Sequence, residues 1–140
     1  MNNQDGKNNN QILPPKKIKV VDIKGKGRGV VATQDIKKGE IIEYCPIIFI
    51  SDKEASFFEK ENTFLNFYCL LQPETKKSCI MLRYGFFYNH SKNPNAEVDY
   101  DIIELKNYLF FKALKNIKSG KEITFDYHFD NGKEEFLKLD

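Results

Sequence analysis

The sequence lacks tryptophan, paired cysteines and long apolar runs, and these absences exclude several classes of protein. Its three cysteines, Cys45, Cys69 and Cys79, form no CxxC pair, so neither a disulfide framework nor a zinc knuckle is expected. No apolar run approaches membrane-spanning length, and the first residues contain no signal-peptide core. We therefore expect reduced thiols, an intracellular location in the cytoplasm or nucleus, and no membrane partner.

An excess of charge of one sign is also missing. Lysine and arginine total 22 against 20 acidic residues, which leaves a formal charge of +2 on 140 residues. Dedicated nucleic-acid binders usually carry a strongly basic face, so this balance predicts no direct nucleic-acid partner. The length suits one domain. Aromatic residues make up 14% of the chain, with 12 Phe and 7 Tyr, and they supply enough bulk for a core.

The pattern of residues predicts a tail and one mostly β domain with short helices. Residues 1–17, rich in Asn and Gln at their start, are expected to be a disordered N-terminal tail, and 18–140 the folded domain. Helical spacing of apolar residues favours one or two short helices in 52–71. A short segment, 130–140, closes the chain and is compatible with a short helix. The segments expected to be extended are 18–23, 30–32, 41–44, 47–50 (separated from the previous one by Pro46), 78–90, 96–104 and 107–114.

A degenerate repeat links two distant parts of the chain. Residues 32–41 contain Ala, Ile, Lys and Gly in an order that recurs in residues 113–123. Each copy predicts a strand, a turn and another strand, with Gly39 and Gly120 at backbone positions of positive φ. Two such units favour small separate sheets over one large sheet.

Three segments carry candidate chemistry. The first is the glycine-rich turn Gly25-Lys26-Gly27-Arg28-Gly29, whose backbone can approach a polar ligand closely; alone, it is equally a flexible hairpin turn. The second, 86–96, places Asn, His, Ser and Asn after an aromatic run, where they must bind a ligand or another chain segment. The third, 120–127, ends at Tyr127, which by itself reads as a core tyrosine with a bonded hydroxyl.

Together these segments resemble the SET domain family of protein-lysine methyltransferases. That family has a Gly-x-Gly turn, an Asn-His-Ser-x-x-Pro-Asn segment and a Glu-[Ile/Leu]-x-x-Asp-Tyr segment in this order. They stand here as 27–29, 89–95 and 122–127, and the resemblance covers roughly residues 18–130. It implies a SET fold of several small β-sheets around a C-terminal pseudoknot, with 51–80 as a variable insert. It also implies methyl transfer from S-adenosylmethionine to a lysine amine, with S-adenosylhomocysteine as product.

The resemblance assigns roles to individual residues. Tyr127 matches the catalytic tyrosine, and Tyr44 matches an aromatic position that lines the lysine channel. Phe125 matches a switch position where Phe permits di- or trimethylation, although it also reads as a core residue. Phe136 is our hypothesis for the aromatic that covers the adenine ring, with Phe129 as the other available ring. The implied cofactor contacts are Lys26, Gly27, Arg28, Gly29, Phe87, Asn89, His90, Tyr127 and Phe136.

The chain also departs from many relatives. Lys92 stands where a zinc-binding cysteine often follows Asn-His-Ser, and no cysteine follows Cys79, so no metal is expected. Phe86 replaces an arginine that is common before the Phe of the middle motif. The chain is therefore similar in form to minimal zinc-free SET proteins of viruses and bacteria, which would make the host nucleus a further location.

Partners and activity remain open on the sequence alone. The resemblance implies a lysine-bearing protein or peptide as substrate, such as a histone tail. Acidic residues in 97–104 would attract a basic peptide, or form a solvated hairpin face. A homodimer also stays open. The alternative functions are a catalytically inactive SET-like module that binds S-adenosylmethionine or a peptide, or that dimerises, and a purely structural β domain.

Overall fold

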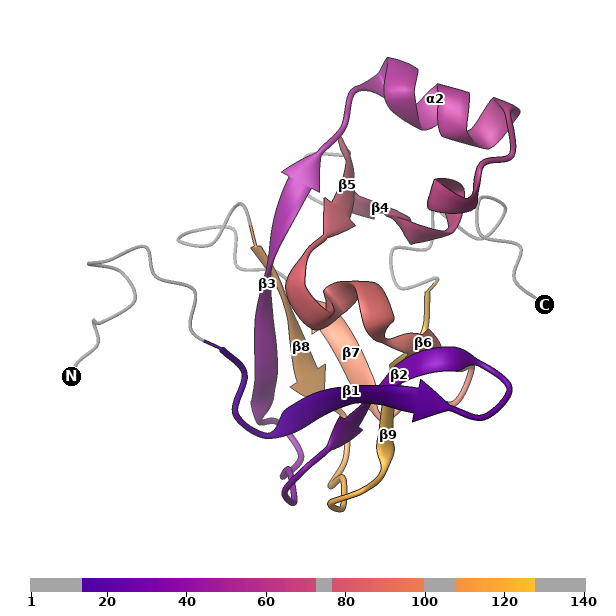
Figure 1. Cartoon of the computed structure of the whole chain (residues 1–140). Helices are drawn as coiled ribbons and strands as arrows, with labels where there is room; N and C mark the ends of the chain where they lie inside the picture. Colours follow the sequence, from indigo (N-terminus) through magenta and orange to yellow (C-terminus); the bar gives the residue numbers. More distant parts are fainter. Residues whose placement is uncertain (1–13, 73–76, 100–107, 128–140) are drawn as a thin grey trace.

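The computed structural model describes residues 14–72, 77–99 and 108–127, and in these it is mostly β (Figure 1). This confirms the predicted fold class. The strands are β1 (Ile18–Ile23), β2 (Gly27–Ala32), β3 (Ile41–Phe49), β4 (Cys69–Gln72), β5 (Lys77–Met81), β6 (Asn89–His90), β7 (Ala96–Asp99), β8 (Tyr108–Ala113) and β9 (Glu122–Phe125). The helices are α2 (Asp52–Lys60) and the 3-10 helices η1 (Phe64–Tyr68) and η2 (Arg83–Phe87). The expectations for the tail before residue 14, for residues 100–107 within and between two predicted strands, and for the segment 130–140 lie outside the described residues.

The first sheet has the strand order β1-β2-β9-β6. Strands β1 and β2 form an antiparallel hairpin, whose turn is closed by a 3.0 Å hydrogen bond from the Lys26 N–H to the Ile23 carbonyl. Gly25 and Gly27 adopt φ of 81° and 83° there, a conformation that favours glycine. Strand β9 lies between β2 and β6. The last described strand is therefore held between two segments from much earlier in the chain.

The second sheet has the order β4-β5-β3-β8-β7. Its strand β3 continues through Pro46, so the predicted break there is wrong. The reason is a change of partner: β3 pairs with β8 from Ile41 to Pro46 and with β5 from Ile47 to Phe49. Proline lacks a backbone N–H, and it stands here at the end of one ladder, where the missing donor breaks no continuous row of bonds.

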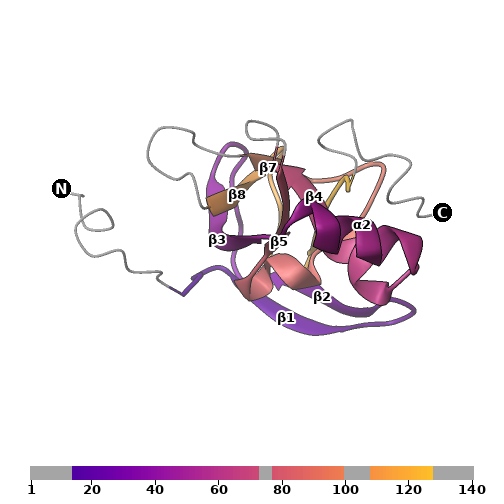
Figure 2. The ribbon, with the colours of Figure 1, turned by 90° about the horizontal axis from the view of Figure 1, so that it is seen from above.

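The helices α2 and η1 both lie within residues 52–71, where helical spacing predicted one or two short helices. Helix α2 begins at a capping box, in which the Ser51 hydroxyl accepts from the Glu54 N–H at 3.0 Å and the Glu54 carboxylate accepts from the Ser51 N–H at 2.9 Å. None of the residues of α2 is buried, and the helix lies at the edge of the molecule (Figure 2). The prediction that residues 78–90 are extended is only partly right, because η2 interrupts them. This helix begins at Arg83, whose φ is positive at 62°.

The degenerate repeat folds into two turns that bind each other reciprocally. We call residues 33–40 and 114–121 the paired turns; they lie side by side below β3 and β8 in Figure 1. Ile36 and Ile117 exchange two backbone hydrogen bonds of 2.8 Å each. The Gly39 N–H donates to the Ala113 carbonyl at 2.8 Å, and the Gly120 N–H donates to the Ala32 carbonyl at 2.7 Å. The two glycines have φ of 88° and 91°, as their sequence positions predict.

The core lies between the two sheets and extends to the site described below. Its largest fully buried side chains include Tyr88, Phe111, Leu109 and Ile123. Tyr88 and Phe111 are stacked, with ring centroids 3.7 Å apart. The middle motif is thus part of the hydrophobic core, which fixes its backbone in place.

Candidate active site

The junction of β6 and β9 brings the second and third candidate segments together. These two strands run parallel, with Asn89 opposite Thr124 and His90 opposite Phe125. The Ser91 N–H continues the pairing with a 3.0 Å hydrogen bond to the Phe125 carbonyl. The middle motif therefore lies directly beside the segment that leads to Tyr127.

Asn89 and Glu122 attach the glycine-rich turn to this junction. The Asn89 amide Nδ2 donates to the Arg28 carbonyl at 2.8 Å and to Glu122 Oε2 at 2.7 Å. The other oxygen of that carboxylate, Oε1, lies 3.0 Å from Lys26 Nζ. A Cβ on Gly29 would lie 2.7 Å from Glu122 Oε2 and 2.8 Å from Asn89 Nδ2. Glycine is required at this position because the network fills the space beside it.

Asn95 completes the attachment of β9. Its Nδ2 donates to the Glu122 carbonyl at 2.9 Å, and its Oδ1 accepts from the Thr124 N–H at 2.9 Å. One side chain thus satisfies two backbone groups of the strand that leads to Tyr127. The sequence analysis did not name Glu122 or Asn95 as site residues. Each lies within one of the quoted motifs, and that position could have identified it.

Tyr127 is held at both its backbone and its hydroxyl. The Tyr127 N–H donates to His90 Nδ1 at 3.1 Å, and the Tyr127 hydroxyl donates to the Tyr88 carbonyl at 2.8 Å. The same Nδ1 atom lies 3.8 Å from the Asp126 carboxylate. His90 therefore acts here as an acceptor that positions the backbone of Tyr127.

The Tyr127 phenol stays protonated at ordinary pH. Burial, the nearby Tyr68 hydroxyl and the Glu122 carboxylate raise its pKa to about 12. Since its proton is directed to the Tyr88 carbonyl, the phenol oxygen remains available as an acceptor for a third group. These facts favour an orienting role for Tyr127 over that of a general base.

A narrow aromatic cavity opens beside this phenol. Its enclosed volume is only about 20 Å³, and the space between its walls is about 300 Å³ when the solvent at its open mouth is included. Tyr68 and Phe86, which line it, are stacked with ring centroids 4.4 Å apart. Phe125 contacts the Tyr127 ring at 4.9 Å between centroids and is 3% exposed, so it is both a core residue and a wall residue. The lining residues are Tyr68, Leu70, Met81, Gly85, Phe86, Tyr88, Phe125 and Tyr127.

A buried carboxylate supports the cavity wall from behind. Glu43, 4% exposed, accepts from the Tyr88 hydroxyl at 2.8 Å and from the Tyr84 N–H at 3.2 Å. The Arg83 Nε lies 3.8 Å from the same carboxylate. Burial raises the pKa of Glu43, although these donors and Arg83 act in the opposite direction. Sequence reasoning missed Glu43 and Tyr88, because nothing in their local pattern indicates that residues 45 positions apart would meet.

The remaining predicted residues lie in different places. Lys26, Gly27 and Arg28 are exposed on the hairpin turn, and the Arg28 guanidinium lies 6.0 Å from the centre of the Phe87 ring. Tyr44 is 40% exposed, with its ring 5.6 Å from that of Phe110. The structure does not bring Tyr44 to the cavity, so its expected role in a lysine channel is not supported by its position. Phe136 lies outside the described residues.

The turn and the 89–90 pair fit a small charged cofactor. A Cβ built on Gly27 would meet no atom within 4 Å, so the side of the turn next to the attached Gly29 is open to a ligand. Lys26 and Arg28 supply positive charge there, which suits a carboxylate group. Asn89 uses both amide protons within the protein and leaves its carbonyl oxygen as an acceptor.

A metal-binding cluster of side chains and a membrane-spanning helix can be excluded for the described ranges alone. Residues 14–72, 77–99 and 108–127 contain no group of three or more His, Cys, Asp or Glu residues that could hold a metal ion. Within the same ranges, no helix has the length and apolar character needed to cross a membrane.

The fold and the site define a small β domain in which a glycine-rich turn, an Asn-His pair and a buried tyrosine meet at an aromatic cavity. The chain belongs to the SET domain family, which matches residues 27–128. It is 35% identical over 120 residues to the Xenopus tropicalis N-lysine methyltransferase KMT5A, covering 79% of this chain and 35% of that protein. It therefore spans about a third of the length of this relative.

Other similarities agree with this assignment. A Schizosaccharomyces pombe histone-lysine N-methyltransferase specific for H3 lysine-37 is 31% identical over 110 residues, which cover 79% of this chain and 72% of that protein. A crystal structure of a Plasmodium falciparum protein assigned as a candidate histone methyltransferase superposes with a TM-score of 0.64 at 33% identity, covering 81% of this chain and 95% of that chain. The Neurospora SET domain protein DIM-5 shares the fold, with a TM-score of 0.62 at 23% identity over 79% of this chain and 51% of its own.

Proposed function

We propose that this chain transfers a methyl group from S-adenosylmethionine to a lysine side-chain amine of a protein. The observation that carries the proposal is the Tyr127 phenol, fixed by the Tyr88 carbonyl at 2.8 Å on the wall of an aromatic cavity. His90 positions its backbone, and Asn89 attaches the glycine-rich turn to the same junction. The matched relatives named as lysine methyltransferases support the same activity.

In this proposal the cofactor is held by the open side of the turn and the strand beside it. The residues that would contact it are Lys26, Gly27, Arg28, Gly29, Phe87, Asn89, His90 and Tyr127, with Phe136 as the proposed cover of the adenine. When bound, S-adenosylmethionine supplies a methyl group activated by a sulfonium. The chain itself must bring a neutral amine to that methyl and keep it aligned.

The cavity is suited to the neutral form of the lysine amine. A free lysine has a pKa near 10.4, and deprotonating it at pH 7 costs about 4–5 kcal/mol. Aromatic and aliphatic walls disfavour the ammonium because they replace water. The Tyr127 oxygen, whose own proton is donated to Tyr88, can accept one N–H of the amine and orient its lone pair.

Phe125 leads us to propose a di- or trimethylated product. Its ring lines the cavity next to Tyr127 and brings no hydroxyl that could fix the amine in one orientation. A methylated amine can therefore rotate within the cavity for a further round of transfer. Histones are the proposed substrates, since the matched relatives include enzymes named for histone lysines, and the proposed location is inside the cell, where histones are found.

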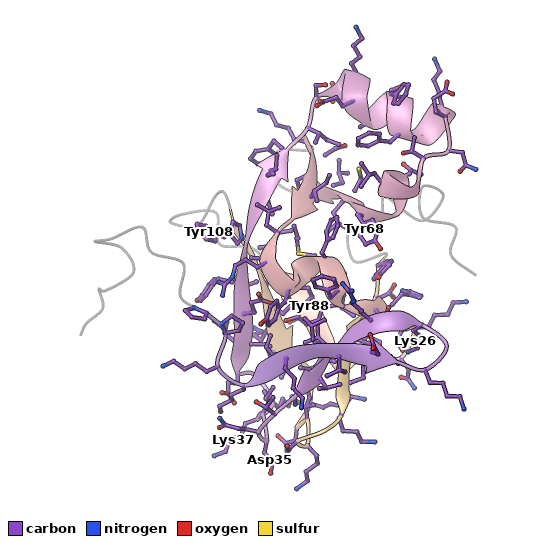
Figure 3. All side chains as sticks on the ribbon, viewed as in Figure 1. Lys26, Asp35, Lys37, Tyr68, Tyr88 and Tyr108 are labelled. Atoms are coloured by element: carbon purple, nitrogen blue, oxygen red, sulfur yellow. The ribbon has the colours of Figure 1, made fainter. Side chains whose placement is uncertain are left out.

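The test is methyl transfer from labelled S-adenosylmethionine to histones, read by label incorporation and mass spectrometry. We expect lysine methylation by the wild type and a severe loss in Tyr127→Phe, with cofactor binding retained by calorimetry. Tyr108→Phe is the matched control, because Tyr108 lies on the outer part of β8, away from Tyr68 and Tyr88 (Figure 3). Cofactor binding without transfer to any protein would instead support an inactive SET-like module.

A further inference from the structure

The paired turns carry a concentration of lysine that the site does not use. Lys37, Lys38, Lys115, Lys118 and Lys121 are all exposed on residues 33–40 and 114–121. The same residues contain two acidic side chains, and each has a lysine partner: Asp35 lies 3.9 Å from Lys118, and Glu40 lies 2.6 Å from Lys17. Across the described ranges, no carboxylate forms an ion pair with Lys37, Lys38, Lys115 or Lys121.

These lysines stand on a rigid scaffold. Besides the reciprocal bonds of Ile36 and Ile117, each turn caps the other with a side chain. The Lys38 N–H donates to Asn116 Oδ1 and the Ser119 N–H donates to Asp35 Oδ1, each at 2.9 Å. Two segments about eighty residues apart in sequence are therefore fixed together, and their lysines form one basic surface.

The total charge conceals this surface. The segment 51–61, around α2, carries four acidic residues and two lysines, and it lies at the opposite end of the molecule from Lys37 (Figure 3). The two ends therefore carry opposite net charges within a near-neutral total. Such an asymmetric charge distribution steers an anionic partner to one face, so a formal charge of +2 does not argue against a polyanionic partner.

We infer that the paired turns bind the phosphate backbone of duplex DNA. The surface contains lysine and no arginine, since Arg28 and Arg83 lie elsewhere. Arginine is the residue that recognises carboxylates as a bidentate fork, so an acidic protein patch is the less suitable partner. The paired turns contain no aromatic residue, and single-stranded nucleic acid is usually held by stacking on aromatic rings. Lysine point charges on a rigid surface suit phosphate contacts that do not read sequence.

This surface is separate from the cavity, and the inference does not depend on methyl transfer. If the proposed histone substrate is correct, contact with DNA would hold the chain on nucleosomes while its cavity stays open to a lysine. Binding without base contacts is expected to be weak, with a Kd of about 10⁻⁴–10⁻⁶ M at physiological salt.

The experiment is fluorescence anisotropy of a short labelled DNA duplex of arbitrary sequence with the full chain, over a series of salt concentrations. The double variants Lys37→Gln/Lys38→Gln and Lys115→Gln/Lys121→Gln each remove two positive charges from one turn. Each is expected to weaken binding and to reduce the salt slope by about 0.9 for every phosphate contact removed. The combined quadruple variant is expected to weaken binding by roughly tenfold or more.

The matched control is Lys53→Gln/Lys60→Gln on α2, which removes two charges at the other end. It is expected to bind DNA as the wild type does. Equal weakening by this control and by either double variant would show that only net charge matters and would overturn the inference. So would unchanged binding by the quadruple variant, or equally tight binding of polyglutamate. All four lysines are exposed, so each variant is expected to fold as the wild type does. Thermal unfolding of each variant checks this.

Discussion

The hydroxyl of Tyr127 donates a 2.8 Å hydrogen bond to the backbone carbonyl of Tyr88. The side chain of Tyr88 points the other way, into the core, where its own hydroxyl donates to Glu43 at 2.8 Å. The residue that fixes the proposed catalytic phenol is thus fixed in turn by a buried carboxylate on β3. A change at Glu43, which does not line the cavity, should therefore reach the site through Tyr88.

Tyr88→Phe should lower stability by about 1–3 kcal/mol, because a buried carboxylate loses a donor. Burial raises the pKa of Glu43, so folding favours the protonated carboxyl, and stability is lost as the pH rises through that raised pKa. The Tyr88 hydroxyl offsets part of this loss, since it stabilises the charged form. The variant should therefore be more strongly destabilised at about pH 8 than near pH 4. Denaturant unfolding at both pH values measures the difference.

Tyr84→Phe is the control, because Tyr84 contacts Glu43 through its backbone N–H. A loss of stability of the same size in both variants would contradict the role of the Tyr88 hydroxyl.

Gly29→Ala should damage the attachment of the glycine-rich turn. The added Cβ would lie within 2.8 Å of Asn89 and Glu122, and overpacking of this kind costs about 1–3 kcal/mol. We expect lower stability in thermal unfolding together with a higher Kd for S-adenosylmethionine in calorimetry. Gly25→Asn is the comparison, because a Cβ at Gly25 meets no atom within 4 Å and Asn tolerates positive φ. Wild-type cofactor binding by Gly29→Ala would rule out this account of the turn.

Tyr127 should be among the last tyrosines of the chain to ionise. Its pKa is raised to about 12, from about 10 in an unfolded chain. The stability linked to its phenol is therefore fully present below about pH 10 and is lost as the pH rises towards 12. Ultraviolet difference absorbance should show one fewer late-ionising tyrosine in Tyr127→Phe than in the wild type. Loss of an early-ionising tyrosine in that variant would mean that the phenol is not buried.

Phe125→Tyr should restrict the proposed reaction to one methyl group. The new hydroxyl would stand on the cavity wall beside Tyr127 and could bind the amine, so a monomethylated amine could no longer turn for another transfer. Mass spectrometry of histone peptides should show di- or trimethyl-lysine with the wild type and monomethyl-lysine with the variant. Identical product ratios would remove Phe125 from the control of product state.

Much of the fold was predictable because its strands depend on local patterns. The hairpin from Ile18 to Ala32 follows from alternation and a glycine-rich turn, and Gly39 and Gly120 were predicted to have positive φ for the same reason. Pro46 was misread, since its tolerance depends on a change of partner strand that local sequence cannot reveal. The 3-10 helix η2 was missed because its residues are aromatic enough to resemble a strand.

The site residues were likewise predictable where a local motif marks them and missed where their role depends on a distant partner. Asn89, His90 and Tyr127 were predicted from motifs and are brought together by the parallel pairing of β6 with β9. Glu43 was missed, because its partner Tyr88 is far away in sequence and a buried carboxylate has no local pattern. Tyr44, its neighbour on β3, was expected in the channel but is on the opposite face of the strand, since successive side chains alternate.

The reciprocal pairing of Ile36 with Ile117 also has a consequence during synthesis. The first turn reaches its final hydrogen-bonding partners only in residues made about eighty positions later. A nascent chain that has emerged only as far as β7 would present Ile36 to solvent or to chaperones. Premature termination or a stall before Ile117 is made should therefore leave a product that is degraded, even though most of the described strands are already complete.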